Sequence, residues 1–370
     1  MLTNIARCAY RAFFNVVFRP MDAEKAHGVG AWGIGWLGRT APLRKLAYEY
    51  CKPDPSLRVR AMGLEFLSPF GLAAGFDKNA SMIDGLTALG FGHIEVGTVT
   101  PLAQPGNPKP RMFRLPEDRA LINRMGFNNK GAENAAGNIA VRETRDAIVG
   151  VNIGKNKDTP AEDAVSDYVK SAKAVLEFAD YLVINVSSPN TPGLRGLQEL
   201  DALEPILRET KAVTGETPLL VKIAPDLEED AIRKICELAA EVGLAGVVAT
   251  NTTIARSPLS TSKRVVEAYG AGGLSGKPVA ERSLAVLRIV RDALPEDMCV
   301  ISVGGVTSHY DVRDRLDAGA TLVQGYTAFL YEGPLWAASI NRGLVAPKYN
   351  GKTKLDAKAE AAAKKAAAKN

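Results

Sequence analysis

The chain has few of the residues from which metal centres and disulfide frameworks are built. Its 370 residues include only four cysteines, which are far apart and form no Cys-x-x-Cys pair, and only three histidines. Structural zinc sites and disulfide-rich folds need clustered cysteine or histidine, so the sequence indicates neither, and we predict no metal site. Isolated cysteines are typical of a protein from a reducing compartment.

A long hydrophobic run and a strong charge bias are also absent. No apolar stretch reaches the roughly 18 residues that span a bilayer, and no small-residue cleavage site follows an apolar stretch at the N-terminus, so a secretory signal is not indicated. The 46 lysine and arginine residues exceed the 41 acidic residues by only five, which gives a net charge of +5. Part of this excess lies in the last twenty residues, so we predict no nucleic-acid partner.

Short apolar runs alternate with helical patterns through the middle of the chain. Each run is rich in Val, Ile or Leu, and helical patterns such as residues 167–179 and 228–243 lie between the runs. Strands of this kind are typical of a parallel sheet buried on both faces. The runs cover residues 70–74, 93–99, 148–154, 181–187, 218–224, 246–252, 299–305 and 321–327.

Eight such units predict an α/β fold of the (β/α)8 TIM-barrel type, whose usual length is about 250 residues. An open doubly wound sheet is disfavoured, because the Gly-x-Gly-x-x-Gly turn expected after its first strand is absent. A small β-hairpin is predicted before the first barrel strand, over residues 57–69 with a turn at Gly63. The long connection over residues 101–130 is expected to be a functional loop on the C-terminal face of the barrel.

Polar side chains gather where the predicted barrel strands end. An asparagine offers both a donor and an acceptor, and so matches the amide edges of a pyrimidine-like ring or a flavin. A single asparagine at such a point more often caps a helix or fixes a turn, but a whole rim of polar residues favours a binding site. The rim consists of Asn152, Asn185, Asn190, Asn251, Lys78 and Lys222.

Glycines follow the later strands, in GGLSG (272–276), SVGG (302–305) and QGYT (324–327). Glycine lets backbone N–H groups approach a phosphate, and TIM barrels often build a phosphate site after strands seven and eight. A simple turn explains any single one of these glycines equally well. GLSGKP does not fit a Walker A loop, because Ala271 and Pro278 replace the required glycine and hydroxyl residue. The phosphate of FMN is the better candidate.

Five motifs carry a family resemblance: AAGFDKN, NRMGFNN, NVSSPNTPGLR, TNTT and GGLSG. In order and spacing they resemble the membrane-associated, quinone-reducing class of dihydroorotate dehydrogenases, over roughly residues 40–340. NRMGFNN and NVSSPNTPGLR together are the specific part. The resemblance implies bound FMN, oxidation of dihydroorotate to orotate in pyrimidine biosynthesis, and a membrane quinone as the final electron acceptor.

By this resemblance Ser188 is the catalytic base, which removes the C5 proton while a hydride leaves C6 for the flavin. The soluble class has cysteine at this position, so Ser188 favours the quinone-reducing class. Serine is a poor base at its free pKa and must rely on neighbours or a proton relay. Ser187 is the alternative, although on a strand its side chain would point to the opposite face.

The resemblance also assigns binding residues. It implies that substrate is held by Lys78, Asn123, Arg124, Met125, Gly126, Phe127, Asn185, Asn190, Asn251 and Thr252. It implies that FMN is bound by Ala74, Gly75, Phe76, Asp77, Lys78, Thr98, Asn152, Asn185, Lys222, Thr250, Gly276, Gly305, Tyr326 and Thr327. Lys78 would pair with the substrate carboxylate. Lys222, near flavin N1, would stabilise the anionic reduced ring.

The N-terminal segment is expected to bring the enzyme to its electron acceptor. Apolar residues from Ile5 to Val17 recur at helical spacing with arginines between them, and Trp32 and Trp36 lie four residues apart. This pattern is typical of interfacial helices, although helices docked on the barrel would share it. With the resemblance, we predict a two-helix cap that lies peripherally on lipid, on the cytoplasmic side of the bacterial inner membrane. The chain has neither a second nucleotide fingerprint nor a cysteine cluster for an iron–sulfur centre.

Three regions are predicted: a helical membrane and quinone cap (1–45), an FMN-binding barrel (46–345) and a disordered Ala/Lys-rich tail (346–370). A monomer is expected. One alternative is another FMN-dependent TIM-barrel oxidoreductase acting on a dihydropyrimidine, for which a cysteine acid or base is expected. Another is an inactive flavin-binding or membrane scaffold protein, against which Ser188 and the two lysines argue.

Overall fold

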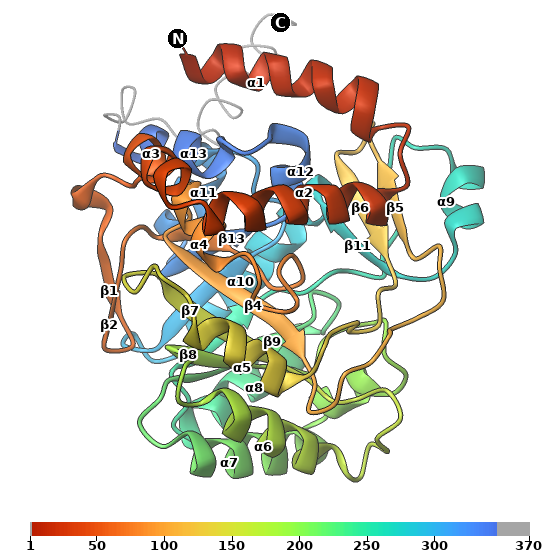
Figure 1. Cartoon of the computed structure of the whole chain (residues 1–370). Coiled ribbons are helices and arrows are strands. Elements are labelled where there is room, and N and C mark those ends of the chain that lie inside the picture. The colour runs from red at the N-terminus through yellow and green to blue at the C-terminus, as the bar shows by residue number, and fades with distance from the viewer. Residues whose placement is uncertain (1, 346–370) are drawn as a thin grey trace, which may run out of the picture.

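The computed structural model describes residues 2–345, and its centre is a closed barrel of eight parallel strands (Figure 1). The strands follow the chain round the barrel, and the last pairs with the first through Gln324 and Gly71. Each strand lies within or matches one of the eight predicted runs, so the predicted TIM barrel is confirmed. The strands are β3 (Phe70–Leu72), β4 (His93–Val99), β7 (Ile148–Ile153), β8 (Tyr181–Asn185), β9 (Leu219–Ile223), β10 (Gly246–Ala249), β12 (Cys299–Val303) and β13 (Leu322–Gly325).

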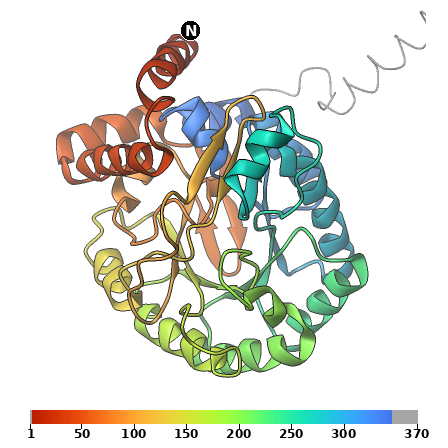
Figure 2. The same ribbon diagram turned by 90° about the vertical axis from the view of Figure 1, so that its right-hand side faces the viewer.

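Helices form a ring outside the strands (Figure 2). Because successive strand residues point to opposite faces, Ile94 and Val96 pack against the helices, whereas Glu95 points into the barrel. The helices of this layer are α4 (Ile83–Ala88), α5 (Ala132–Ala140), α6 (Ala164–Val175), α7 (Leu200–Thr214), α8 (Glu229–Glu241), α10 (Ala280–Ala293), α11 (His309–Asp317), α12 (Thr327–Glu332) and α13 (Trp336–Val345). Outside this layer are three 3-10 turns, η2 (Pro55–Leu57), η3 (Leu194–Gln198) and η4 (Lys277–Val279), and the helix α9 (Lys263–Tyr269).

The N-terminal region contains more helix than predicted. Helix α1 (Leu2–Phe13) continues into a π-helical turn, η1 (Phe14–Phe18), and α2 (Ala23–Arg39) follows. The side chain of Asp22 caps α2, accepting hydrogen bonds from the backbone N–H groups of Glu24 and Lys25 at 3.1 and 2.9 Å. Both predicted cap helices are thus present, and a further helix, α3 (Ala41–Cys51), packs on α4, so that the predicted boundary at residue 45 falls inside a helix.

Two small antiparallel sheets accompany the barrel. The predicted hairpin is confirmed as β1 (Val59–Ala61) and β2 (Leu64–Phe66), joined by a turn at Met62 and Gly63. The long connection contains a second hairpin, β5 (Met112–Leu115) and β6 (Ala120–Asn123), and β6 pairs with β11 (Gly273–Gly276). The GGLSG segment, for which a phosphate-binding glycine segment or a simple turn was considered, is largely a strand. The predicted tail, 346–370, lies outside the described residues.

Candidate active site

The carboxyl ends of the barrel strands surround a recess, here called the polar cavity, which consists of two adjacent spaces of about 110 and 80 Å³ that share lining residues. The larger space is lined by predicted site residues: Ala74, Gly75, Lys78, Thr98, Asn123, Met125, Gly126, Phe127, Asn185, Ser188, Asn190, Lys222, Asn251, Thr252 and Tyr326. The smaller space shares several of these and adds Thr250, Gly276, Gly305 and Thr327. Segments from residue 74 to residue 327 thus meet at one site.

Side-chain amides are linked to one another beneath this cavity. Asn251 Nδ2 donates to Asn185 Oδ1 at 3.2 Å, and Asn185 Nδ2 donates to Asn152 Oδ1 at 3.0 Å. Asn185 Nδ2 also lies 2.9 Å from Thr98 Oγ1. Since each amide is held by its neighbour, donors and acceptors are fixed before any ligand arrives, which lowers the ordering cost of binding.

A buried carboxylate ends this chain of hydrogen bonds. Glu95 is fully buried inside the barrel, and it accepts from Asn152 Nδ2 at 2.8 Å and from Gln324 Nε2 at 2.9 Å. Lys222 Nζ lies 3.3 Å from the same carboxylate, so Glu95 is the counter-ion of Lys222. Sequence reasoning missed Glu95, although a charged residue within the apolar run HIEVGTV was a signal that could have found it.

The two neighbouring serines differ in their surroundings. Ser188 lines the polar cavity, and its Oγ lies 3.3 Å from the backbone N–H of Asn190. Ser187 is fully buried outside the lining, where its hydroxyl donates to Asn185 Oδ1 at 3.1 Å and accepts from Asn251 Nδ2 at 3.0 Å. A molecule in the cavity would therefore meet Ser188, while Ser187 holds the amide network.

Lys78 and Asp77 point in different directions. Lys78 lines the cavity, and burial lowers the pKa of Lys78 to about 8, an effect that the nearby Glu24 carboxylate opposes. Asp77 is fully buried away from the lining, and its carboxylate accepts from the backbone N–H groups of Ser81 and Met82 at 2.9 and 2.7 Å. Burial raises the pKa of Asp77, opposed by these hydrogen bonds.

Four predicted binding residues do not line the polar cavity in this structure. Asn152 lies below it, within the amide network, and Asp77 holds the turn after β3. The guanidinium of Arg124 donates to backbone carbonyls, those of Tyr269, Ala271 and Pro110. Phe76 faces a different space. Conversely, Met112, Leu121 and Ser275 line the polar cavity and were not predicted.

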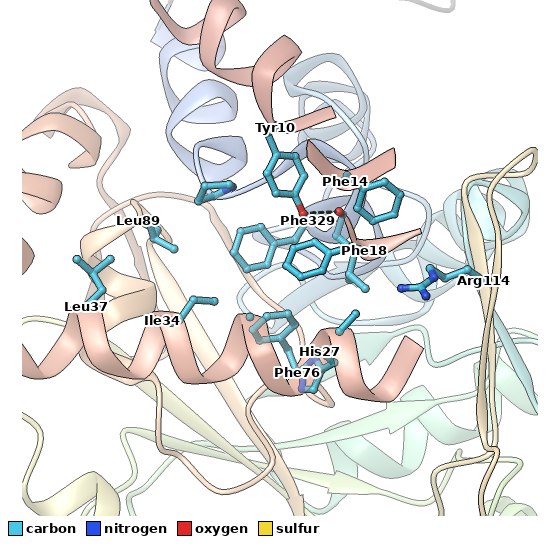
Figure 3. Close-up of a pocket in the computed structure, with 16 residues that line it drawn as sticks. Tyr10, Phe14, Phe18, His27, Ile34, Leu37, Phe76, Leu89, Arg114 and Phe329 are labelled. Atoms are coloured by element: carbon cyan, nitrogen blue, oxygen red, sulfur yellow. Dashed lines mark hydrogen bonds between the residues drawn. The ribbon is translucent and has the colours of Figure 1, made fainter. Parts of the chain in front are cut away.

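The space that Phe76 faces is an apolar cavity of about 290 Å³ between the N-terminal helices and the barrel (Figure 3). Its lining includes Tyr10, Phe14, Phe18, His27, Gly30, Gly33, Ile34, Leu37, Phe76, Leu89, Arg114 and Phe329. Burial, with the nearby Lys78 charge, lowers the pKa of His27 to about 4, so this imidazole is neutral at pH 7.

The apolar and polar cavities are neighbours. Gly75 lines the polar cavity and Phe76, the next residue, lines the apolar one. The ring of Phe76 packs edge-on against Tyr326, a polar-cavity residue, with 5.4 Å between ring centroids. The rings of Phe76 and Tyr326, in contact with each other, thus lie between the two spaces.

The polar cavity fits a flat, hydrogen-bonding ring system such as a flavin. Small residues, Ala73, Ala74 and Gly325, leave room along one part of it, while amides and Lys222 supply donors and acceptors. The hydroxyl oxygen of Thr252 is buried there without a hydrogen-bond partner among the described residues, as expected for a group that bonds a ligand. Within residues 2–345 there is no His, Cys, Asp or Glu cluster suited to a metal ion, and no helix that could cross a membrane.

Comparison with known proteins gives a consistent result. Residues 56–347 match the family model described as dihydroorotate dehydrogenase. The chain is 58% identical to a dihydroorotate dehydrogenase (quinone) of Clavibacter michiganensis, over 91% of this chain and 98% of that protein. A relative of the same name from Thermobifida fusca is 51% identical, covering 91% and 92% of the two chains.

A solved structure agrees with these relatives. The crystal structure of DHODH from Eimeria tenella in complex with ferulenol has a TM-score of 0.77 and 38% sequence identity. The similarity covers 88% of this chain and 91% of that one. On this evidence of matched fold, extent and identity, the chain belongs to the dihydroorotate dehydrogenase family.

Proposed function

We propose that this protein oxidises dihydroorotate to orotate, with FMN as hydride acceptor and a membrane quinone as final electron acceptor. The observation that carries the proposal is the meeting of Ser188, the linked asparagines, Lys78 and the buried Lys222 in one cavity. The cavity would hold FMN, and the chemistry that this group would supply is that of a hydride acceptor for C6 of the substrate. Ser188 Oγ takes the proton from C5 while its own hydroxyl proton leaves through a relay to solvent, so that the ring gains its double bond.

The remaining residues bind and orient. Asn123, Asn190 and Asn251 present amides to the ring of the substrate, and Asn190 Nδ2 is itself held by Asn123 Oδ1 at 3.2 Å. Lys78 pairs with the substrate carboxylate. Lys222 places a positive charge where the reduced flavin is anionic, and Glu95 below it fixes the position of the ammonium group.

The apolar cavity supports a lipid-soluble electron acceptor. A quinone ring bound there would have the contacting rings of Phe76 and Tyr326 between it and the flavin site. Large apolar side chains on the N-terminal helices are exposed, among them Val16 at 76%, Trp32 at 69% and Trp36 at 50%. Such a surface is suited to peripheral contact with a membrane, and we place the protein on the cytoplasmic side of the bacterial inner membrane.

An anaerobic titration tests the proposed reaction. The purified protein is expected to be yellow, and dihydroorotate is expected to bleach the flavin absorbance, which a quinone then restores. Other dihydropyrimidines serve as matched controls and should not bleach it. A colourless protein, or a flavin that dihydroorotate leaves oxidised, would contradict the proposal. Bleaching by a dihydropyrimidine that lacks the carboxylate would favour the alternative FMN-dependent oxidoreductase.

Orotate affinity is expected to depend on the protonation of Lys78. The pKa of this lysine is about 8 in the free site, so the ammonium loses its proton as the pH rises past that value. The orotate dissociation constant should be flat below pH 8 and should rise above it, approaching tenfold per pH unit, because the carboxylate binds the charged form. Titration of the flavin spectrum with orotate between about pH 6 and pH 9 measures this.

Lys78→Met provides the control for that measurement. Without the ammonium group, orotate should bind weakly at every pH, with no break near the lysine pKa. A wild-type affinity that stays constant across the range would show that Lys78 does not pair with the carboxylate.

A further inference from the structure

A third recess lies between the N-terminal helix and the β5–β6 hairpin, separate from the polar cavity. We call it the arginine cavity, and its volume is about 350 Å³. Arg11, Arg19 and Arg119 line it together with Asn15, while the rings of Phe14 and Tyr331 contact each other beside them, 5.5 Å apart. Nothing in the proposed oxidation of dihydroorotate uses this recess.

Positive charge exceeds negative charge at this recess. The carboxylate of Glu332, whose side chain is only 4% exposed, forms ion pairs with Arg7, Arg11 and Arg119. One carboxylate thus faces three guanidinium groups, each of which keeps further N–H donors available. The fourth arginine, Arg19, has no side-chain hydrogen bond or ion pair within residues 7–345. Glu117 is the one acidic residue in the lining.

The surroundings of the arginine cavity are apolar and exposed. Phe13, Val16 and Val17 belong to the same helical stretch as the lining residues, and their exposed fractions are 48%, 76% and 36%. An anion held by the arginines would therefore lie at the border between a charged recess and a bare apolar surface. A phospholipid has the same arrangement, with a phosphate group next to its acyl chains.

We propose that the arginine cavity binds the phosphodiester headgroup of an anionic phospholipid. Guanidinium groups suit a phosphate because their planar N–H donors match two of its oxygens at once. A lipid is favoured over a soluble phosphate by the apolar side chains beside the recess, which a free anion would leave exposed to water. The inference rests on the proposed membrane contact and names its lipid chemistry.

The position of Phe14 gives this site a consequence for electron transfer. Phe14 lines the arginine cavity on one side and the apolar cavity on the other. A headgroup bound by Arg11 and Arg19 would hold α1 and η1 against the membrane surface. The entrance of the apolar cavity would then be kept facing the lipid that contains the quinone.

Vesicle binding by an Arg19→Gln variant tests the proposal. The full-length protein is mixed with vesicles of phosphatidylcholine alone, or with added phosphatidylglycerol, and the bound fraction is measured by flotation. The matched control is Arg60→Gln, which removes the same charge from an exposed side chain on β1. We expect Arg19→Gln to weaken binding to the anionic vesicles roughly fivefold, and the control to leave it unchanged.

The other outcomes separate the possible explanations. Equal loss in both variants would mean non-specific attraction and would overturn the site, as would a normal Arg19→Gln affinity. Competition by inorganic phosphate at millimolar concentration would show a soluble-anion site and overturn the lipid assignment. If the wild-type protein binds no vesicles at all, the membrane contact in the proposed function fails. Dihydroorotate oxidation with a soluble dye should be normal in both variants, which shows that each is folded.

Discussion

Ser188→Ala is expected to lower dihydroorotate-dependent turnover by roughly 10²- to 10⁴-fold while the protein retains its flavin. The reason is that Ser188 is the hydroxyl best placed to accept a proton. The described lining of the polar cavity contains no carboxylate or imidazole. Burial raises the pKa of the Tyr326 phenol, and the Thr98 hydroxyl is held within the amide network, where it donates to Asn152 Oδ1 and accepts from Asn185 Nδ2.

The measurement is stopped-flow reduction of the bound flavin by dihydroorotate, together with the FMN content of the purified variant. Ser187→Ala is the matched control, because it removes a neighbouring hydroxyl that holds Asn185 and Asn251 but does not line the cavity. It should weaken substrate binding more than the rate of flavin reduction. A parallel loss of FMN and activity in Ser188→Ala would mean a structural role. Full activity there would move the base to Thr252, whose buried hydroxyl has no described partner.

The barrel could be predicted from the sequence because its signal is local. Strands buried on both faces must be apolar throughout, so each of them appears as a short continuous run. The polar rim could be predicted for the same reason, because polar residues stand out near the ends of apolar runs. Asn185 and Lys222 are two of them, and parallel strands bring those ends to one face of the barrel.

Other features depend on pairings between distant segments, which a local pattern does not record. The GLSG segment is a strand because it pairs with Ala120–Asn123, about 150 residues earlier. Phe76 follows Gly75 directly, yet its ring faces the apolar cavity because α2 crosses the barrel there and His27 packs against it, with 4.9 Å between ring centroids. The AAGFDKN motif was therefore sufficient to predict that this segment belongs to the site. It did not predict which of its side chains point into the polar cavity.

The apolar cavity itself could not be foreseen, since it exists only where α1, η1 and α2 lie over α12 and the first barrel helix (Figure 3). The sequence does, however, leave a trace of it in α2. Gly28, Gly30 and Gly33 are conformationally costly in a helix, and a Cβ atom added at any of them would meet no atom within 4 Å. Two of them, Gly30 and Gly33, line the cavity.

Gly33→Phe is expected to block quinone reduction without disturbing dihydroorotate oxidation. The new ring would extend into the apolar cavity, where a quinone would have to displace or overlap it. Overpacking of this kind costs about 1–3 kcal/mol, which is roughly 5- to 150-fold in apparent quinone affinity. The helix should tolerate the change, because a non-glycine residue is more favourable in a helix interior and the added Cβ meets no neighbour.

Gly28→Phe is the matched control, since it makes the same substitution in the same helix at a glycine outside the cavity lining. Flavin reduction by dihydroorotate, followed anaerobically, should be equal in the wild type and both variants. Reoxidation by a long-chain quinone should be slow in Gly33→Phe alone, and a small soluble dye should still reoxidise it at the normal rate. Equal slowing in both variants would point to altered membrane binding by α2. Normal quinone kinetics in Gly33→Phe would show that electrons leave the flavin by another route, because a blocked apolar cavity would then have no effect on them.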